Sequence, residues 1–64
     1  MSLIEMLDER GMSQRDLARA TGITPQRINA WVKGVRDPGI MALDTARRVS
    51  DALGVTLDEF QSRL

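Results

Sequence analysis

The stretch "SQRDLARATGITPQRINAWVKG", Ser13–Gly34, joins two short amphipathic segments through a glycine. Ser13 lies three residues before Asp16, a spacing in which each side chain can bond the other residue's backbone amide at a helix start. Thr24 followed by Pro25 marks a second start, because proline at the first helical position lacks an N–H that would be unpaired there anyway. The stretch therefore predicts two helices separated by a tight turn.

The same signals recur along the rest of the chain. Ser2 precedes Glu5 by three residues, and Thr56 precedes Glu59 by the same spacing. Glycines suited to left-handed helix ends follow at 11, 22, 34 and 54. The expected helices are 2–10, 13–20, 24–33, 41–53 and 56–63. β-branched residues nowhere alternate over four or more positions, so no strand is expected.

Apolar residues fall at helical spacing in each of these segments. The expected core residues are Leu3, Met6, Leu7, Leu17, Ala18, Ile28, Trp31, Val32, Ala42, Ala46, Val49, Leu53, Leu57 and Phe60. The sequence thus predicts an all-α fold, a compact five-helix bundle. With 64 residues the chain is expected to form a single domain, 1–64.

The composition argues against several classes of function. The chain has no cysteine, histidine or tyrosine, which removes disulfides, the usual metal ligands and most acid–base catalysts. We expect no enzyme activity, no metal and no cofactor, and no small-molecule ligand is evident. No apolar run reaches the roughly 18 residues of a membrane span and no signal-peptide pattern opens the chain. A cytoplasmic protein without a membrane partner is the expectation.

Nine basic and nine acidic residues cancel, but they are unevenly placed. Residues 1–9 sum to −3, residues 10–36 to +5 and residues 37–64 to −2. An anionic partner could therefore be attracted to the middle segment at short range, although the molecule is neutral. A solvated charged helix face is the alternative interpretation.

The helix expected at 24–33 has a distinctive polar face. Ile28, Trp31 and Val32 cluster on one side, which makes Trp31 a core residue rather than a platform for stacking bases. The opposite side carries Gln26, Asn29, Ala30 and Lys33, flanked by Pro25 and Arg27. Amides can contact adenine, a methyl group can meet thymine, and basic side chains can reach guanine or phosphate. This face has no acid to repel phosphate, but an ordinary solvent face remains the alternative.

These residues resemble the helix-turn-helix of the lambdoid phage repressor and Cro family, the XRE family. The matching pieces are "SQ" at 13–14, "LA" at 17–18, "TGIT" at 21–24 and Ile28, Trp31 and Gly34. "TARRVSDALGVTLDEF", 45–60, resembles the closing helices of the family. The resemblance implies a lambda repressor-like domain whose third helix enters the major groove of double-stranded DNA.

The resemblance also assigns roles to individual residues. Base contacts are expected from Pro25, Gln26, Arg27 and Ala30, with Asn29 added from the axial geometry. Proline has no N–H or polar side chain to offer, so Pro25 should contribute shape at most. Phosphate contacts are expected from Gln14, Arg15, Thr24, Lys33 and Arg36. Arg36 lies in "GVRDPGI", 34–40, a connection about three residues longer than usual for the family, and a plain surface loop is the alternative there.

A DNA reader of this size normally binds as a dimer. Val55, Leu57, Phe60 and Leu64 follow the last tight turn and are expected to form a small two-fold interface, with capping of the monomer core as the alternative. Many relatives pair an arginine and a glutamate across the domain where this chain has Leu7 and Val32, so these two should touch. The predicted function is a sequence-specific transcriptional regulator, in the simplest case a repressor of a palindromic operator. A protein-interaction module of the antitoxin or anti-repressor type is the alternative.

Overall fold

The computed structural model describes residues 3–64 and contains five helices within them. They are α1 (Leu3–Arg10), α2 (Gln14–Thr21), α3 (Pro25–Val32), α4 (Leu43–Leu53) and α5 (Leu57–Arg63). There is no strand in this part of the chain. The predicted all-α, five-helix class is confirmed. The proposed start at Ser2 lies outside the described residues.

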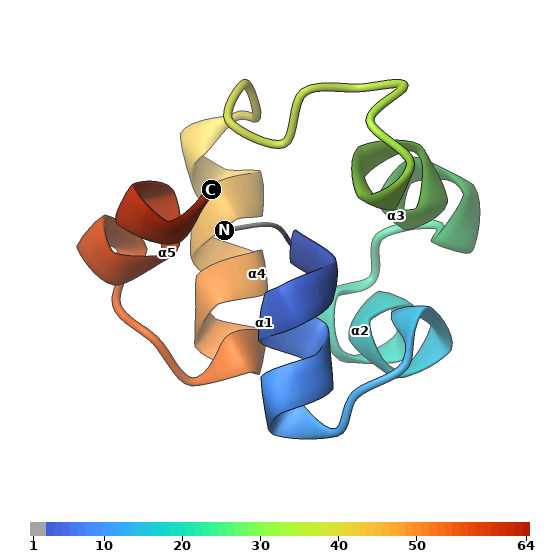
Figure 1. Ribbon diagram of the computed structural model, residues 1–64, viewed down its shortest axis with the longest axis horizontal. Coiled ribbons are helices and arrows are strands. Elements are labelled where there is room, and N and C mark those ends of the chain that lie inside the picture. The colour runs from blue at the N-terminus through green and yellow to red at the C-terminus, as the bar shows by residue number, and fades with distance from the viewer. Residues whose placement is uncertain (1–2) are drawn as a thin grey trace.

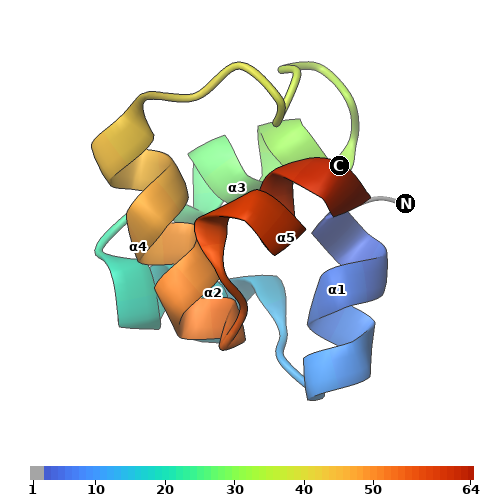
Figure 2. The ribbon, with the colours of Figure 1, turned by 90° about the vertical axis from the view of Figure 1, so that its left-hand side faces the viewer.

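The helices are arranged around one small core. α2 and α3 lie on one side of the molecule and α5 on the other, with α1 and α4 between them (Figures 1 and 2). α2 packs on α3 and α4, α1 packs on α3 and α4, and α5 packs on α4. The buried hydrophobic residues are Leu3, Met6, Leu7, Leu17, Ala18, Ile23, Ile28, Trp31, Ala46, Val49, Leu53 and Phe60. α3 is thus held from behind by both α1 and α2, which leaves its other face open.

Helix ends follow the sequence signals closely, with one exception. Glycines 11, 22, 34 and 54 all adopt positive φ angles at the predicted stops. α4, however, begins at Leu43 rather than at residue 41, and Ala42 is an exposed N-cap in extended conformation. Alanine has no side-chain acceptor for a first-turn amide, and no hydrogen-bonded cap forms there. Placing Ala42 in the core was therefore wrong.

Polar contacts between residues far apart in the sequence also hold the helices together. The Arg10 guanidinium Nη2 donates a hydrogen bond to the Gly54 carbonyl oxygen over 2.9 Å, tying α1 to the end of α4. Arg63 forms an ion pair with Glu9, which ties α5 to α1. Within residues 3–64 no helix is long and apolar enough to cross a membrane. The same residues contain no cluster of three or more acidic, histidine or cysteine side chains suited to a metal ion.

Candidate nucleic-acid interface

α2 begins with a capping box. The Ser13 hydroxyl accepts from the Asp16 backbone N–H over 3.0 Å, and the Asp16 carboxylate accepts from the Ser13 backbone N–H, also over 3.0 Å. The second bond is the main reason that the pKa of Asp16 lies below its usual value; the Ser13 hydroxyl is the next cause, with smaller contributions from Arg19 and Arg15. The one acid on α2 is therefore ionised at neutral pH and occupied at the helix start.

A short turn, Gly22–Thr24, fixes the angle between α2 and α3. Gly22 has a φ of 75°, a left-handed conformation that glycine adopts without strain, and its N–H reaches the Ala18 carbonyl. Buried Thr21 donates its hydroxyl to the Leu17 carbonyl over 2.7 Å and accepts from the Ile23 N–H. Ile23 itself is buried in the core, a role that the sequence analysis did not assign. The Thr21 hydroxyl and the Ile23 side chain thus hold the turn against the core.

α3 starts as the sequence predicted, with Thr24 as N-cap and Pro25 in its first turn. The Thr24 hydroxyl already accepts from the Arg27 N–H, at 3.4 Å. Gln26 and Lys33 are exposed, whereas Asn29 and Ala30 are half-buried. Ile28 and Trp31 are buried, so the expected division of α3 into an inner apolar face and an outer polar face is confirmed. Trp31 is only 4% exposed, which agrees with its expected place in the core.

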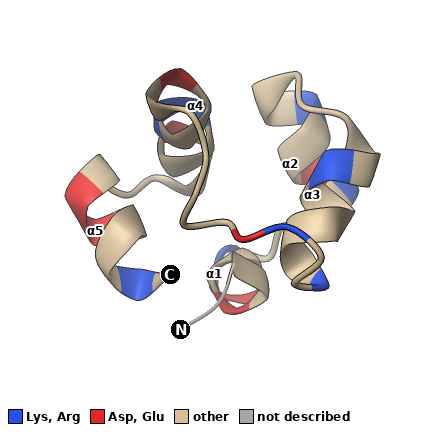
Figure 3. Ribbon diagram, turned by 90° about the horizontal axis from the view of Figure 1, so that it is seen from above, with Lys and Arg blue, Asp and Glu red and all other residues tan. Residues whose placement is uncertain are grey.

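Apart from Arg10, which ends α1, the basic residues of the middle segment belong to α2, α3 and the region that follows α3 (Figure 3). Arg15, Arg19 and Lys33 are exposed there, and Gln14, at the start of α2, is half-buried. The acidic residues of α5 lie on the opposite side of the molecule (Figure 3). The charges of this neutral chain are therefore unevenly distributed, with mainly basic residues around α2 and α3 and the acidic residues of α5 on the opposite side.

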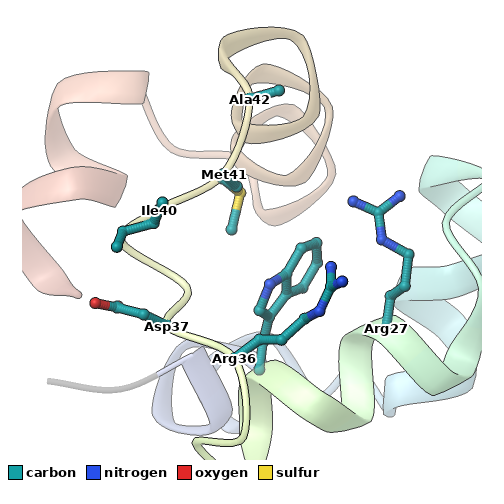
Figure 4. Close-up of a pocket in the computed structure, with 7 residues that line it drawn as sticks. Arg27, Arg36, Asp37, Ile40, Met41 and Ala42 are labelled. Atoms are coloured by element: carbon teal, nitrogen blue, oxygen red, sulfur yellow. The ribbon is translucent and has the colours of Figure 1, made fainter.

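Arg27 does not extend outward beside Gln26. Its guanidinium carbon lies 5.5 Å from the centre of the Trp31 ring, one helical turn further along α3. Arg36, from the loop after α3, lines the same cleft as Arg27 and Trp31, together with Met41 and Ile40 (Figure 4). This cleft was not predicted from the sequence, in which the four-residue spacing of Arg27 and Trp31 was its only signal.

The segment proposed as a dimer interface is largely committed to the monomer. Phe60 is completely buried in the core, so it has no surface to offer a partner in this structure, which favours the alternative that it caps the monomer core. Val55, Leu57 and Leu64 pack against the core and remain half-buried. Leu7 and Val32 belong to one apolar cluster, Val32 half-buried; that they touch stays a prediction.

Exposed apolar side chains gather instead in and after the long loop. Within residues 3–64, the exposed large hydrophobic residues are Ile4, Val35, Ile40 and Leu43. Val35 and Ile40 are 79% and 80% exposed, and Leu43 is 61% exposed. These three leave more apolar surface uncovered than the segment 55–64 does.

Comparison with known proteins gives a consistent result. The helix-turn-helix family model HTH_3 matches residues 3–60. The chain is 38% identical over 53 residues to a protein named repressor protein CI of Enterobacteria phage phi80, covering 83% of this chain and 21% of the phage protein. It is 37% identical over 57 residues to an SPbeta prophage-derived uncharacterized HTH-type transcriptional regulator, YotL, of Bacillus subtilis strain 168, covering 89% of this chain and 69% of YotL. No solved structure matches the chain significantly.

The chain therefore spans about a fifth of the phi80 protein and just over two thirds of YotL. The matched region includes the capped α2, the turn at Gly22 and the open face of α3. By sequence and by fold, this chain belongs to the helix-turn-helix family HTH_3, of the lambdoid repressor or XRE type.

Proposed function

We propose that the chain is a sequence-specific regulator of transcription that reads double-stranded DNA with α3, acting as a repressor by occupying its operator. The observation that carries the proposal is the outer face of α3, which is polar, contains no acid and continues into a basic face formed with α2. The names of the two relatives, a repressor and a transcriptional regulator, support it.

Base reading is assigned mainly to Gln26, whose exposed amide can form paired hydrogen bonds with adenine. Asn29 and Ala30 are half-buried and would face the groove floor, and Pro25 offers only its shape. Phosphate contacts are assigned to Lys33 and to the first turn of α2 at Gln14 and Arg15, where free backbone amides and the helix dipole favour an anion. Thr24 can hold a phosphate by donating its hydroxyl O–H, since the helix cap uses the hydroxyl only as an acceptor.

Selection of bound duplexes from a random library, followed by fluorescence anisotropy, tests this assignment. Gln26→Ala should weaken binding to the selected sequence by about 1–3 kcal/mol and leave scrambled DNA nearly unaffected. Lys33→Ala should weaken both DNAs alike and reduce the salt dependence by about one unit of slope. Gln61→Ala, an exposed glutamine on α5, is the matched control and should change neither. A library that yields no enriched sequence would refute specific reading.

The proposed complex on DNA contains two copies related by a two-fold axis. Such a pair reads half-sites one helical turn apart, with its two recognition helices about 34 Å from each other. The Cα trace measures 24 × 23 × 21 Å, so two copies side by side can reach this spacing. Binding to a full inverted repeat should then be cooperative, and binding to a single half-site should not. Sedimentation showing one copy per full site would contradict the dimer.

A second candidate function is binding to another protein. The observation in its favour is the uncovered apolar surface of Val35, Ile40 and Leu43. Failure of the DNA selection together with intact folding would favour this alternative.

A further inference from the structure

The cleft between α3 and the following loop has an unusual lining. Arg27 from α3 lies over the Trp31 indole, Arg36 from the loop lines the same cleft, and Met41 contributes an apolar wall (Figure 4). The cavity measures about 400 Å³, within the range of small-ligand sites. The Val35 and Arg36 amides both donate to the Ala30 carbonyl and hold the loop against α3, so that helix and loop form adjacent walls of the cleft.

Both guanidinium groups have unused hydrogen-bond donors. Among residues 3–64, neither Arg27 nor Arg36 forms an ion pair or a side-chain hydrogen bond with a protein acceptor, and the only side-chain interaction of Arg27 is with the indole. The one acid of the cleft is Asp37, whose Oδ1 accepts from the Gly39 N–H over 2.8 Å. Two permanent cations and one partly occupied carboxylate leave the cleft with a net positive charge.

This chemistry matches a phosphate group. Guanidinium presents a planar fork of donors that fits two oxygens of a phosphate, and stacking on an aromatic ring fixes the plane of that fork in advance. The cavity is larger than one phosphate, so a sugar can rest against the apolar side at Met41. We infer that Arg27 and Arg36 together hold a single phosphate group in this cleft, supplied by the backbone of the DNA that α3 reads.

The inference rests on the proposed DNA binding and changes the role that the family resemblance implied for one residue. Arg27 becomes a backbone contact that positions α3, rather than a reader of bases beside Gln26. Its side chain lies over Trp31 and faces Arg36 across the cleft, as that role requires. Phosphate contacts carry no sequence information, so the effects of Arg27 and Arg36 must be the same on every duplex.

Salt dependence distinguishes one shared phosphate from two separate ones. Each neutralised phosphate contributes about 0.9 to the slope of log K against log salt concentration on duplex DNA. The double variant Arg27→Ala/Arg36→Ala should therefore lose about one unit of slope, on selected and scrambled DNA alike. A loss of about two units would mean two independent contacts and would overturn the shared site. A loss confined to the selected sequence on Arg27→Ala alone would make Arg27 a base reader and would also overturn it.

Trp31 provides a direct readout, because it is the only tryptophan and the chain has no tyrosine. Its emission is recorded while the full chain is titrated with duplex DNA and, separately, with inorganic phosphate, with anisotropy of labelled DNA measured in parallel. Arg48→Ala, an exposed arginine on α4, is the matched control, and circular dichroism checks that each variant is folded. Arg27→Lys keeps the charge without the planar fork and should recover only part of the response.

The expected result is a saturable change in emission at the same DNA concentration at which anisotropy rises. The change in emission should persist in Arg48→Ala. It should disappear in the double variant, which is expected to bind DNA with lower affinity than the wild type. A response to inorganic phosphate as well would show that the cleft accepts phosphate from either source and would support the site. Bound DNA with unchanged wild-type emission would overturn it. If anisotropy shows no DNA binding at all, the proposed function fails, and the inorganic phosphate titration alone decides whether the cleft binds phosphate.

Discussion

Replacing Phe60 with alanine tests whether α5 belongs to the monomer core. Phe60 is completely buried and is the one fully buried residue of α5. Truncating a buried phenylalanine to alanine costs about 3–5 kcal/mol. A chain of 64 residues has a total unfolding free energy of about 3–10 kcal/mol. Phe60→Ala should therefore lose from about a third to all of the stability, and Phe60→Leu, which keeps most of the volume, should lose on the order of 1 kcal/mol.

Urea denaturation followed by Trp31 fluorescence measures both losses, because the indole is almost wholly buried in the native state. For so small a chain, 1 kcal/mol moves the midpoint by about 0.5–1 M urea. The shift for Phe60→Leu should be identical at two protein concentrations tenfold apart, since a core contact is intramolecular. Leu64→Ala, at a half-buried position, is the comparison and should shift the midpoint less. The opposite result would be a wild-type midpoint that increases with protein concentration, together with a Phe60→Leu midpoint that does not increase and otherwise equals that of the wild type. Such a result would place Phe60 in an interface and refute the reasoning.

Three further predictions concern stability. Val32→Glu should lower the free energy of unfolding, measured by urea denaturation, by about 1–3 kcal/mol, because it puts an unpaired charge at a half-buried position against the core. A cost near zero would show that water reaches this position. Gly54→Ala should cost more than Gly11→Ala, since both glycines have positive φ but only at Gly54 would the added Cβ displace the Arg10 guanidinium and break its hydrogen bond to the Gly54 carbonyl; equal costs would contradict this contact. The Asp16 carboxyl, followed by NMR, should titrate below its usual pKa because the Ser13 backbone amide bonds its charged form. Its contribution to stability should accordingly be complete above the unfolded-state pKa and be lost as the pH falls through the lower folded-state pKa, a dependence that Asp16→Asn should abolish.

Local signals in the sequence determined the helices and most of the core. A hydroxyl three residues before an acid, or a threonine before a proline, marks where backbone amides need an acceptor, and this requirement involves only neighbouring residues. The starts of α2, α3 and α5 were predicted correctly on this ground. Helical spacing also predicted that Ile28 and Trp31 would be buried, which left Gln26 and Lys33 on the open face.

The tertiary structure alone decided which surfaces remain uncovered. Leu64 follows Phe60 by four residues, a spacing that would place both on one face of a helix. The packing of α5 on α4 nevertheless buries Phe60 completely and leaves Leu64 half-buried. The path of the chain from α3 to α4 likewise brings Arg36 beside Arg27, nine residues earlier, and creates the cleft. Spacing along one helix fixes which side chains share a face, whereas contacts between a helix and an irregular loop depend on backbone angles that no periodic pattern encodes.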